Sequence, residues 1–382
     1  MTYPNDYDSD WNNKIKNYDS TKHDWYNFWL SVAKEKFPQI ESLETIHLIL
    51  TPSDLFDLSK HCQDACKRSE FVRRANEYYK DLLDNVVPNE WMIQRYFTVR
   101  IVIPNQQNSG RLLPFHNDIW TGNGLGVRTL WTPITESYNT NSMQVVDYDS
   151  SIDLMNRCYR ERWSFDQLQT ESRKKSSPIN LVPGQAFLFQ SQHIHGNFNN
   201  ETEVTRWSMD GRILIKGGHY HKKLPGGYFR FLDETSSQEK IDLNKKYISY
   251  AGWNSKYSRH IPLPMQRSAI ADYCKMFNIK INDYQFENDF LDWFPSLEQF
   301  ITSYNIDAIV MCSIFNLPDD AERRYELLKL AVDSGVELHF ANEVCSVRTY
   351  ADIEHIKHIF EFVNENPDPN VFLGLADAKR ST

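Results

Sequence analysis

A succession of short β-rich segments between Trp91 and Ile215 constrains the fold of this chain more than any other feature. The segments are rich in β-branched and aromatic residues and are separated by Gly, Asn and Pro: WMIQRYFTVRIVIP, GVRTLWTPI, SMQVVDY, QAFLFQSQHIHG and RWSMDGRILI. Several such strands in succession predict a sandwich or barrel. One helix, predicted over residues 150–175, interrupts them.

The segments on either side of this region have different patterns. Residues 1–90 carry apolar residues at three- and four-residue spacing, which predicts helices. From residue 245 onward, strand and helix patterns alternate, and the nearly continuous apolar run IDAIVMCSIF is typical of a strand buried on both faces. Ser296 and Gln299 have the spacing of a capping box. This alternation predicts a small three-layer α/β domain with a parallel sheet.

The length of the chain favours two domains, because 382 residues exceed what one hydrophobic core usually holds. We expect a β-rich domain with N-terminal helices over residues 1–232. A polar linker follows over 233–244, and an α/β Rossmann-like domain occupies 245–382. The predicted fold class is therefore α+β multidomain.

Composition and charge limit the classes of binding partner that the chain can have. A net charge of −9 argues against nucleic acid or an anionic membrane surface. No apolar run approaches the length of a membrane span, and the polar N-terminus does not have the pattern of a signal peptide. The 6 cysteines are scattered and form no C-x-x-C pair. These features predict a cytoplasmic protein with free thiols.

Two histidines, an aspartate, an arginine and a serine follow one another in an order that points to metal chemistry. His116 and Asp118 have strand spacing, so both would point to one face. His195 ends a later β-rich run, Arg206 follows eleven residues on, and Ser208 lies two residues further. Two imidazoles and one carboxylate form the facial triad of non-haem Fe(II) oxygenases. An arginine with a neighbouring hydroxyl can hold the distal carboxylate of 2-oxoglutarate.

With these motifs, the segment from about Trp91 to Arg212 resembles Fe(II)/2-oxoglutarate dependent oxygenases of the phytanoyl-CoA dioxygenase type. More closely, it resembles the branch found in bacterial surface-carbohydrate gene clusters. The resemblance implies a double-stranded β-helix, or jelly roll, and oxidation of a saccharide or nucleotide-sugar intermediate of cell-surface polysaccharide synthesis by O2. It also implies Fe(II) bound by His116, Asp118 and His195, and 2-oxoglutarate anchored by Arg206 with Ser208.

Two details of the ligand set bear on the chemistry. His193 shares a predicted strand face with His195 and is the rival third ligand. We favour His195, because the family usually has a small residue just after this histidine and Gly196 fits. The presence of Asp118, where a halogenase would have Gly or Ala, favours hydroxylation or desaturation over halogenation.

The candidate substrate residues surround the predicted metal strand. They are Trp120, Asn123, Thr129, Trp131 and Gln144. Trp rings stack on the C–H faces of sugars, although core packing is the commoner role of any one Trp. Which face of residues 128–131 points inward stays open. The alternative to an enzyme is a non-catalytic carbohydrate-binding or scaffold protein of a polysaccharide cluster.

The region from Lys245 onward resembles a companion family from the same kind of carbohydrate cluster. Its β-α order also resembles the catalytic domain of serine recombinases, which carry a Y-x-R-x-S run on the first strand. Here Ser249 and Ala251 replace the Arg and the nucleophilic Ser, so recombination is not supported. The carboxyl ends of the predicted parallel strands nominate a second site, formed by Asn254, Arg259, Ser313, Asn342 and Glu343. A docking or oligomerisation module is the alternative, and a homo-oligomer stays open.

Overall fold

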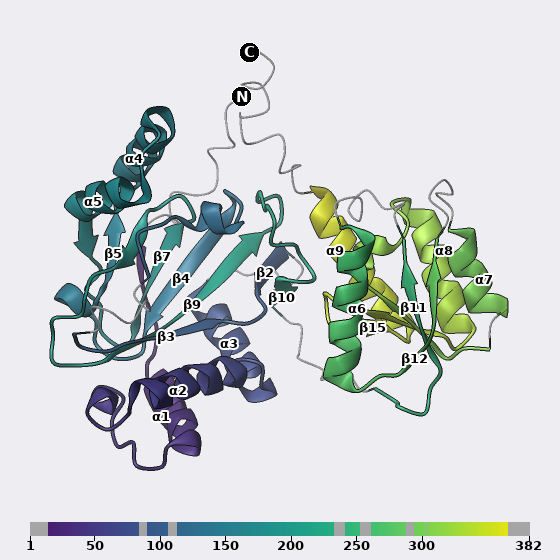
Figure 1. The fold of residues 1–382 in the computed structure, drawn as a ribbon, viewed down its shortest axis with the longest axis horizontal. Coiled ribbons are helices and arrows are strands. Elements are labelled where there is room, and N and C mark those ends of the chain that lie inside the picture. The colour runs from purple at the N-terminus through teal and green to yellow at the C-terminus, as the bar shows by residue number, and fades with distance from the viewer. Residues whose placement is uncertain are drawn as a thin grey trace. The chain divides into compact units, whose positions relative to one another are not determined.

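The computed structural model describes residues 14–83, 90–105, 113–232, 241–252, 261–287, 294–303 and 305–365. The chain divides into two compact units, one built on Met1–Ser236 and the other on Ser237–Asn364. Figure 1 shows that each unit combines helices with β-sheet. The mixed α and β class predicted from the sequence is confirmed. All six cysteines are free thiols.

A large antiparallel sheet forms the centre of the first unit. Its strands follow the order β1-β7-β4-β9-β2-β10, and β3 also pairs with β9. The bounds are β1 (Lys14–Asn17), β2 (Trp91–Gln94), β3 (Thr98–Val102), β4 (Val127–Pro133), β7 (Gln185–Gln190), β9 (Arg206–Ile215) and β10 (Phe229–Phe231). The long strand β9 pairs with β4 along one edge and with β3 and then β2 along the other. It therefore lies in the interior of the sheet.

A second, smaller antiparallel sheet has the order β6-β5-β8, formed by β5 (Met143–Val146), β6 (Ser176–Pro178) and β8 (His195–Asn197). The run QAFLFQSQHIHG, expected to be one strand, is thus two strands in two different sheets. The backbone N–H of His193 donates to the carbonyl of Gln190 at 3.1 Å. This turn ends β7, and the chain leaves the large sheet before β8 begins.

Three helices cover one face of the large sheet, as Figure 1 shows: α1 (Trp25–Lys36), α2 (Pro52–Ala65) and α3 (Ser69–Leu82). They bury Trp25 and Trp29 in one core with Trp207 of β9. The helices predicted in the N-terminal region are confirmed there, and the short strand β1 was not predicted. The single helix predicted over 150–175 is two helices, α4 (Tyr148–Glu161) and α5 (Phe165–Lys175), because Arg162 takes a left-handed φ of 53° and ends α4. The described part of this unit also has the 3₁₀ turns η2 (Ile46–Leu48), η4 (Asp118–Thr121) and η5 (Asn139–Asn141).

Strand alternation gives the large sheet two chemically different faces. Leu130, Leu188, Trp207 and Met209 point into the core under the helices. Their neighbours along the same strands point to the opposite face, where they line a cavity, as Thr129, Trp131, Phe189 and Arg206 do. Because successive side chains of a strand point to opposite faces, the helices support the sheet without occupying this second face.

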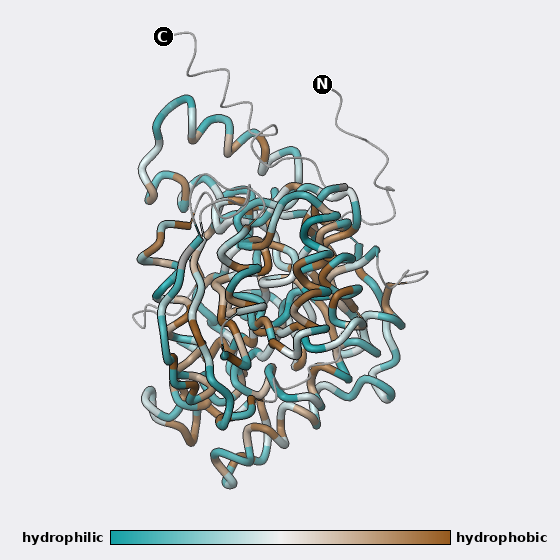
Figure 2. Tube along the Cα trace, turned by 90° about the vertical axis from the view of Figure 1, so that its right-hand side faces the viewer, coloured by the Kyte–Doolittle hydropathy of each residue, from teal (hydrophilic) through white to brown (hydrophobic). Residues whose placement is uncertain are grey.

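The second unit is a five-stranded sheet with the order β12-β11-β13-β14-β15. Its strands are β11 (Tyr247–Ala251), β12 (Ile281–Phe286), β13 (Ala308–Met311), β14 (Glu337–Phe340) and β15 (Cys345–Val347). Its helices are α6 (Leu263–Phe277), α7 (Pro295–Ser303), α8 (Ala321–Asp333) and α9 (Tyr350–Glu365), with the 3₁₀ turn η7 (Ile314–Asn316). The first four strands are parallel, as predicted, but β15 is an antiparallel edge strand. Figure 2 shows hydrophobic and hydrophilic residues alternating along the helices, as amphipathic packing requires.

The expected capping box at the start of α7 is wrong. Ser296 lies inside the helix, which begins at Pro295. The backbone N–H groups of Ser296 and Leu297 donate to the Glu287 carboxylate at 3.3 and 3.2 Å. A side chain from beyond the end of β12 therefore caps this helix. No helix in the described part of the chain combines the length and apolar character needed to cross a bilayer.

Candidate metal centre

His116 and His195 are brought together by a single β-bridge. The N–H of His116 donates to the carbonyl of His195 at 3.0 Å, and the N–H of His195 donates back at 2.8 Å. Residues paired in this way across antiparallel chains project to the same side, and the two imidazole centroids lie 4.5 Å apart. Gly196 permits the approach, because a Cβ there would lie 2.9 Å from the backbone nitrogen of Phe115.

Asp118 reaches the same point from a turn and not from a strand. It is the first residue of the 3₁₀ helix η4 (Asp118–Thr121), whose cap is the Asn117 side chain accepting from the N–H of Trp120 at 3.0 Å. Gly122, with a φ of 92°, ends the helix. The strand geometry predicted for the H-x-D pair is therefore wrong, because these local caps favour a turn.

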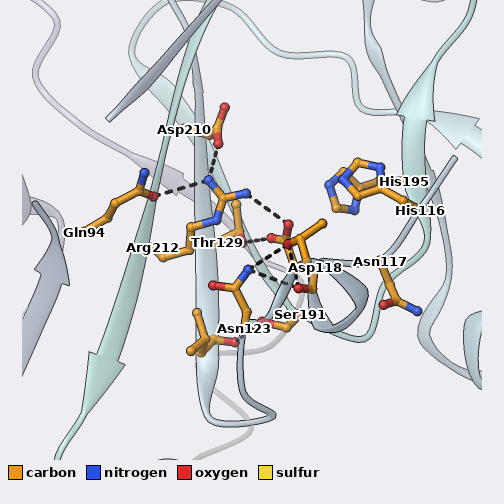
Figure 3. Close-up of polar contacts among 12 residues, drawn as sticks. Gln94, His116, Asn117, Asp118, Asn123, Thr129, Ser191, His195, Asp210 and Arg212 are labelled. Atoms are coloured by element: carbon orange, nitrogen blue, oxygen red, sulfur yellow. Dashed lines mark hydrogen bonds and ion pairs between the residues drawn. The ribbon is translucent and has the colours of Figure 1, made fainter. Parts of the chain in front are cut away.

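The three side chains still converge. One nitrogen from each imidazole and one oxygen of Asp118 all lie within 4.8 Å of one another, and Figure 3 shows the two rings facing the carboxylate. His193 is absent from this cluster among the described residues. Its Nδ1 lies 2.9 Å from the carbonyl of Val146, and its ring packs near Phe189 and Tyr148.

The environment of both imidazoles suits metal binding. Nδ1 of His116 donates to the carbonyl of Pro114 at 2.9 Å, and Nδ1 of His195 donates to that of His193 at 3.0 Å. These bonds fix the ring orientation and place the lone pair on Nε2. Burial lowers the pKa of His116, and burial together with His116 lowers the pKa of His195 to about 4. Both rings are therefore neutral at pH 7, which is the protonation state that binds metals.

Asp118 is buried and held through both carboxylate oxygens. Oδ2 accepts from the Thr129 hydroxyl at 2.6 Å, and Oδ1 accepts from Nη2 of Arg212 at 3.0 Å. Burial alone would raise the pKa of Asp118, but Arg212, His195 and Thr129 outweigh it and hold the pKa well below its ordinary value. Asp118 is thus an ionised carboxylate at neutral pH, as a metal ligand must be.

Sequence reasoning missed the buried charge network behind Asp118. Arg212 also donates to Asp210 at 2.5 Å and to the Gln94 side-chain oxygen at 3.2 Å, and Arg100 donates to Asp210 at 3.1 Å. Figure 3 shows Arg212 between the two carboxylates. The alternation that places Arg206 and Ser208 on one face of β9 also places Asp210 and Arg212 there. Extending the Arg-x-Ser pattern by four residues would have found them.

Arg206 and Ser208 are buried beside this cluster without the partners they require. Nε of Arg206 and Oγ of Ser208 have no hydrogen-bond partner among the described residues. Within the same part of the chain, Nη2 of Arg206 donates one long hydrogen bond to Oδ1 of Asn197 at 3.5 Å. The Arg206 guanidinium lies 5.6 Å from the centre of the Trp131 ring. Burial, with Arg100 adding to the effect, lowers the pKa of Arg206 to about 9. A buried cation in this condition is suited to binding an anion.

One cavity connects Arg206 with His195. It is lined by Arg100, Leu113, Thr129, Trp131, Met143, Phe189, His195, Gly196, Asn197, Arg206, Asp210 and Arg212, which come from strands of both sheets and from the segments between them. Thr129 and Trp131, whose direction the sequence left open, both face it. The cavity therefore brings a buried imidazole of the metal-type cluster and a guanidinium without a carboxylate partner to one place.

The other substrate candidates lie elsewhere. The Asn123 amide donates to the Asp118 carbonyl at 3.1 Å and supports the η4 turn. The Gln144 amide donates to the carbonyl of Asn139 at 2.9 Å and is not among the residues that line the cavity in the described chain. Trp120 is 48% exposed on η4, next to Asp118 along the turn. Only Trp120 combines an exposed ring with proximity to the metal cluster in sequence.

In the second site predicted in the α/β unit, the candidate side chains that the structure describes form hydrogen bonds within the protein. Ser313 donates its hydroxyl to Glu343 at 2.7 Å, and the N–H of Ile314 donates to the other oxygen at 3.0 Å. The Asn342 amide approaches Cys312 Sγ at 3.4 Å. Glu343 and Ser313 thus hold η7 in place. The two remaining candidates, Asn254 and Arg259, lie outside the described residues.

Comparison with known proteins gives only weak likenesses. No family model matches the chain, and no curated protein matches it. Among solved structures, the non-heme monooxygenase ThoJ in complex with nickel matches at 10% identity and a TM-score of 0.32, over 60% of this chain and 84% of that one. The non-heme α-ketoglutarate dependent epimerase SnoN matches at 11% and 0.29, over 60% and 86%. The N-terminal catalytic domain of TP901-1 integrase matches at 14% and 0.26, over 32% and 95%. Likenesses at these values define no family, and the functional argument rests on the site itself.

Proposed function

We propose that this protein is an Fe(II)/2-oxoglutarate dependent dioxygenase, with iron held by His116, Asp118 and His195. The observation that carries the proposal is one cavity that joins His195 to an unpaired, buried Arg206. The histidine–carboxylate cluster alone would suit several metals and reactions. A neighbouring guanidinium with one long hydrogen bond and no carboxylate partner, and a hydroxyl without a hydrogen bond, suit an anionic ligand, a role that the distal carboxylate of 2-oxoglutarate would fill.

The donor set fits Fe(II). Two neutral imidazoles and one carboxylate would hold the ion and would leave coordination positions for a 2-oxo acid and O2. Bound iron supplies the O2 activation that couples decarboxylation of 2-oxoglutarate to oxidation of a C–H bond. Because Asp118 fills a ligand position, none remains for halide, so hydroxylation or another oxidation is favoured over halogenation.

The protein's own residues orient and shield the cosubstrate. Arg206 offers a planar pair of donors that matches a carboxylate, and Ser208, two residues further along β9, offers a hydroxyl on the same face. Trp131, Phe189 and Met143 line the same cavity and give it an apolar wall. Beside such a wall, charged contacts are stronger than they would be in solvent.

The finer parts of the proposal follow the resemblance of the sequence. The first unit is assigned to the jelly-roll fold, and the substrate to a saccharide or nucleotide-sugar of cell-surface polysaccharide synthesis. Trp120 supports a sugar substrate, because an exposed indole on the same 3₁₀ turn as Asp118 offers a flat apolar face for sugar C–H groups. The α/β unit is proposed as a companion module that docks cluster partners or a second copy of the chain.

The decisive experiment measures metal content and succinate formation together. Purified protein with Fe(II), ascorbate and 2-oxoglutarate should form succinate even without substrate, and the Asp118→Ala variant should not. Gln144→Ala, which alters a buried polar group outside the cavity, is the matched control and should keep the activity. A wild-type protein that binds no iron and forms no succinate would refute the enzyme and favour the carbohydrate-binding scaffold.

A further inference from the structure

The ion pair between Arg212 and Asp118 joins a proposed metal ligand to a buried cation that the proposed chemistry does not require. Nη2 of Arg212 lies 3.0 Å from Oδ1 of Asp118, and the two side chains are 8% and 1% exposed. Oδ2 of the same carboxylate accepts from Thr129 at 2.6 Å. A carboxylate held through both oxygens by groups on two neighbouring strands, β4 and β9, has a fixed plane.

The cation that holds Asp118 is itself held. Its other terminal nitrogen, Nη1, donates to Asp210 at 2.5 Å and to Gln94 at 3.2 Å. Asp210 also accepts from Arg100 at 3.1 Å. Gln94 and Arg100 come from β2 and β3, which pair with successive parts of one edge of β9. Arg212 is therefore anchored to the large sheet, while His116 and His195 belong to the bridge that extends the small sheet.

The charges of this network leave Asp118 able to bind a cation. A guanidinium beside a metal ligand would ordinarily cancel the charge that attracts the metal. Here Asp210 faces the same guanidinium at the shorter distance, 2.5 Å against 3.0 Å. Arg212 is thus shared between two carboxylates, so its charge does not compensate Asp118 alone. Arg100, which also contacts Asp210, is 31% exposed, so solvent screens its charge.

We propose that Arg212 is a positioning residue for the metal centre. It fixes the Asp118 carboxylate toward His116 and His195 before any metal binds. A buried carboxylate without this partner would lack compensation for its desolvation in the metal-free protein, and would turn toward water or another donor. The inference rests on the proposed function, since it concerns the same three ligands, but it makes a separate prediction about metal affinity.

The test is a double-mutant cycle on Co(II) affinity, followed by the visible absorption of the bound ion. Arg212→Gln should weaken Co(II) binding by about tenfold to 100-fold, the usual effect of losing a partner that orients a ligand. In an Asp118→Asn background the same substitution should change the affinity by less than about twofold, because its target is already lost. Arg95→Gln is the matched control, since Arg95 donates to the backbone carbonyls of Gly226 and Gly227.

Arg212→Lys keeps the charge but lacks the planar fork that reaches both carboxylates, so it should fall between wild type and Arg212→Gln. It also serves if Arg212→Gln does not fold. A wild type that binds no Co(II) would overturn the proposed function and this inference together. A wild type that binds Co(II), with unchanged affinity in both Arg212 variants or equal losses in both backgrounds, would overturn only the inference.

Discussion

The two units each bury a cluster of polar side chains, and the clusters differ in how their hydrogen bonds are completed. In the α/β unit, the Glu343 carboxylate accepts from Ser313 and from the backbone of Ile314. In the first unit, Arg206 Nε and Ser208 Oγ are equally buried but have no partner among the described residues. Buried polar groups in native proteins are nearly always paired. An incompletely bonded guanidinium and hydroxyl beside a cavity are therefore better suited to bind a ligand than the fully bonded cluster around Glu343.

The largest expected effect is on metal binding, and it distinguishes His195 from its neighbour His193. His195→Ala should abolish succinate formation and weaken Co(II) binding by at least about 100-fold, because it removes one of the three proposed protein ligands. His193→Ala should retain both, because His193 lies outside the ligand cluster of the described chain. Co(II) titration and succinate assay of the two variants check this. The reverse pattern would show that the ligand identity inferred from the geometry is wrong.

Arg206→Met should raise the half-saturating 2-oxoglutarate concentration by about 100-fold, because a charged contact to the distal carboxylate is lost. The same variant should be at least as stable as wild type, since an unpaired buried guanidinium costs desolvation. Kinetics at varied 2-oxoglutarate and chemical denaturation without ligand measure the two effects. A destabilised variant with unchanged cosubstrate dependence would mean that Arg206 is structural.

Acid should destabilise the metal-free protein before it protonates carboxylates. The pKa of His195 is about 4 in the folded chain against 6.5 as the ordinary value. Between these values the unfolded chain binds more protons, so the free energy of unfolding falls as the pH falls, by about 3 kcal/mol in total. Denaturant titrations from pH 7.5 to 4.5 should show this slope, and His195→Asn should flatten it. An unchanged slope in the variant would assign the effect to other groups.

The smallest expected effect is on stability, and it concerns the hydrogen-bonded cluster around Glu343 in the α/β unit. Glu343→Gln should lower the free energy of unfolding by about 1–3 kcal/mol, because charge-assisted bonds to Ser313 and Ile314 are weakened. Co(II) affinity and uncoupled succinate formation should stay at the wild-type level. Loss of activity at unchanged stability would instead give the α/β unit a chemical role and remove the contrast between the two clusters.

The order of the ligand residues was readable from the sequence, but the local geometry was not. Strand alternation placed Arg206 and Ser208 on one face, and β9 has them so. The same reasoning failed at Asp118, where Asn117 and Gly122 cap a 3₁₀ turn. The sequence pattern also predicted one strand where the structure has β7 and β8, because a run of apolar residues does not show that the chain passes from one sheet to another.

Long-range partners were beyond a single sequence. Arg212 meets Asp118 only because β4 and β9 pair with Thr129 opposite Arg212, and register of this kind depends on the whole sheet. Likewise the α7 cap comes from Glu287, nine residues before Ser296. Segment patterns predicted the classes of both units, whereas tertiary pairing decided which polar groups are satisfied.

The bridge between His116 and His195 has a consequence for folding. These residues are 79 positions apart in the chain, so an ion bound to both would join two segments that are distant in the unfolded chain. Because the ligands are brought together only by folding, the ion would bind the folded state alone and would stabilise it by the free energy of binding. Chelation should therefore lower the free energy of unfolding of the first unit.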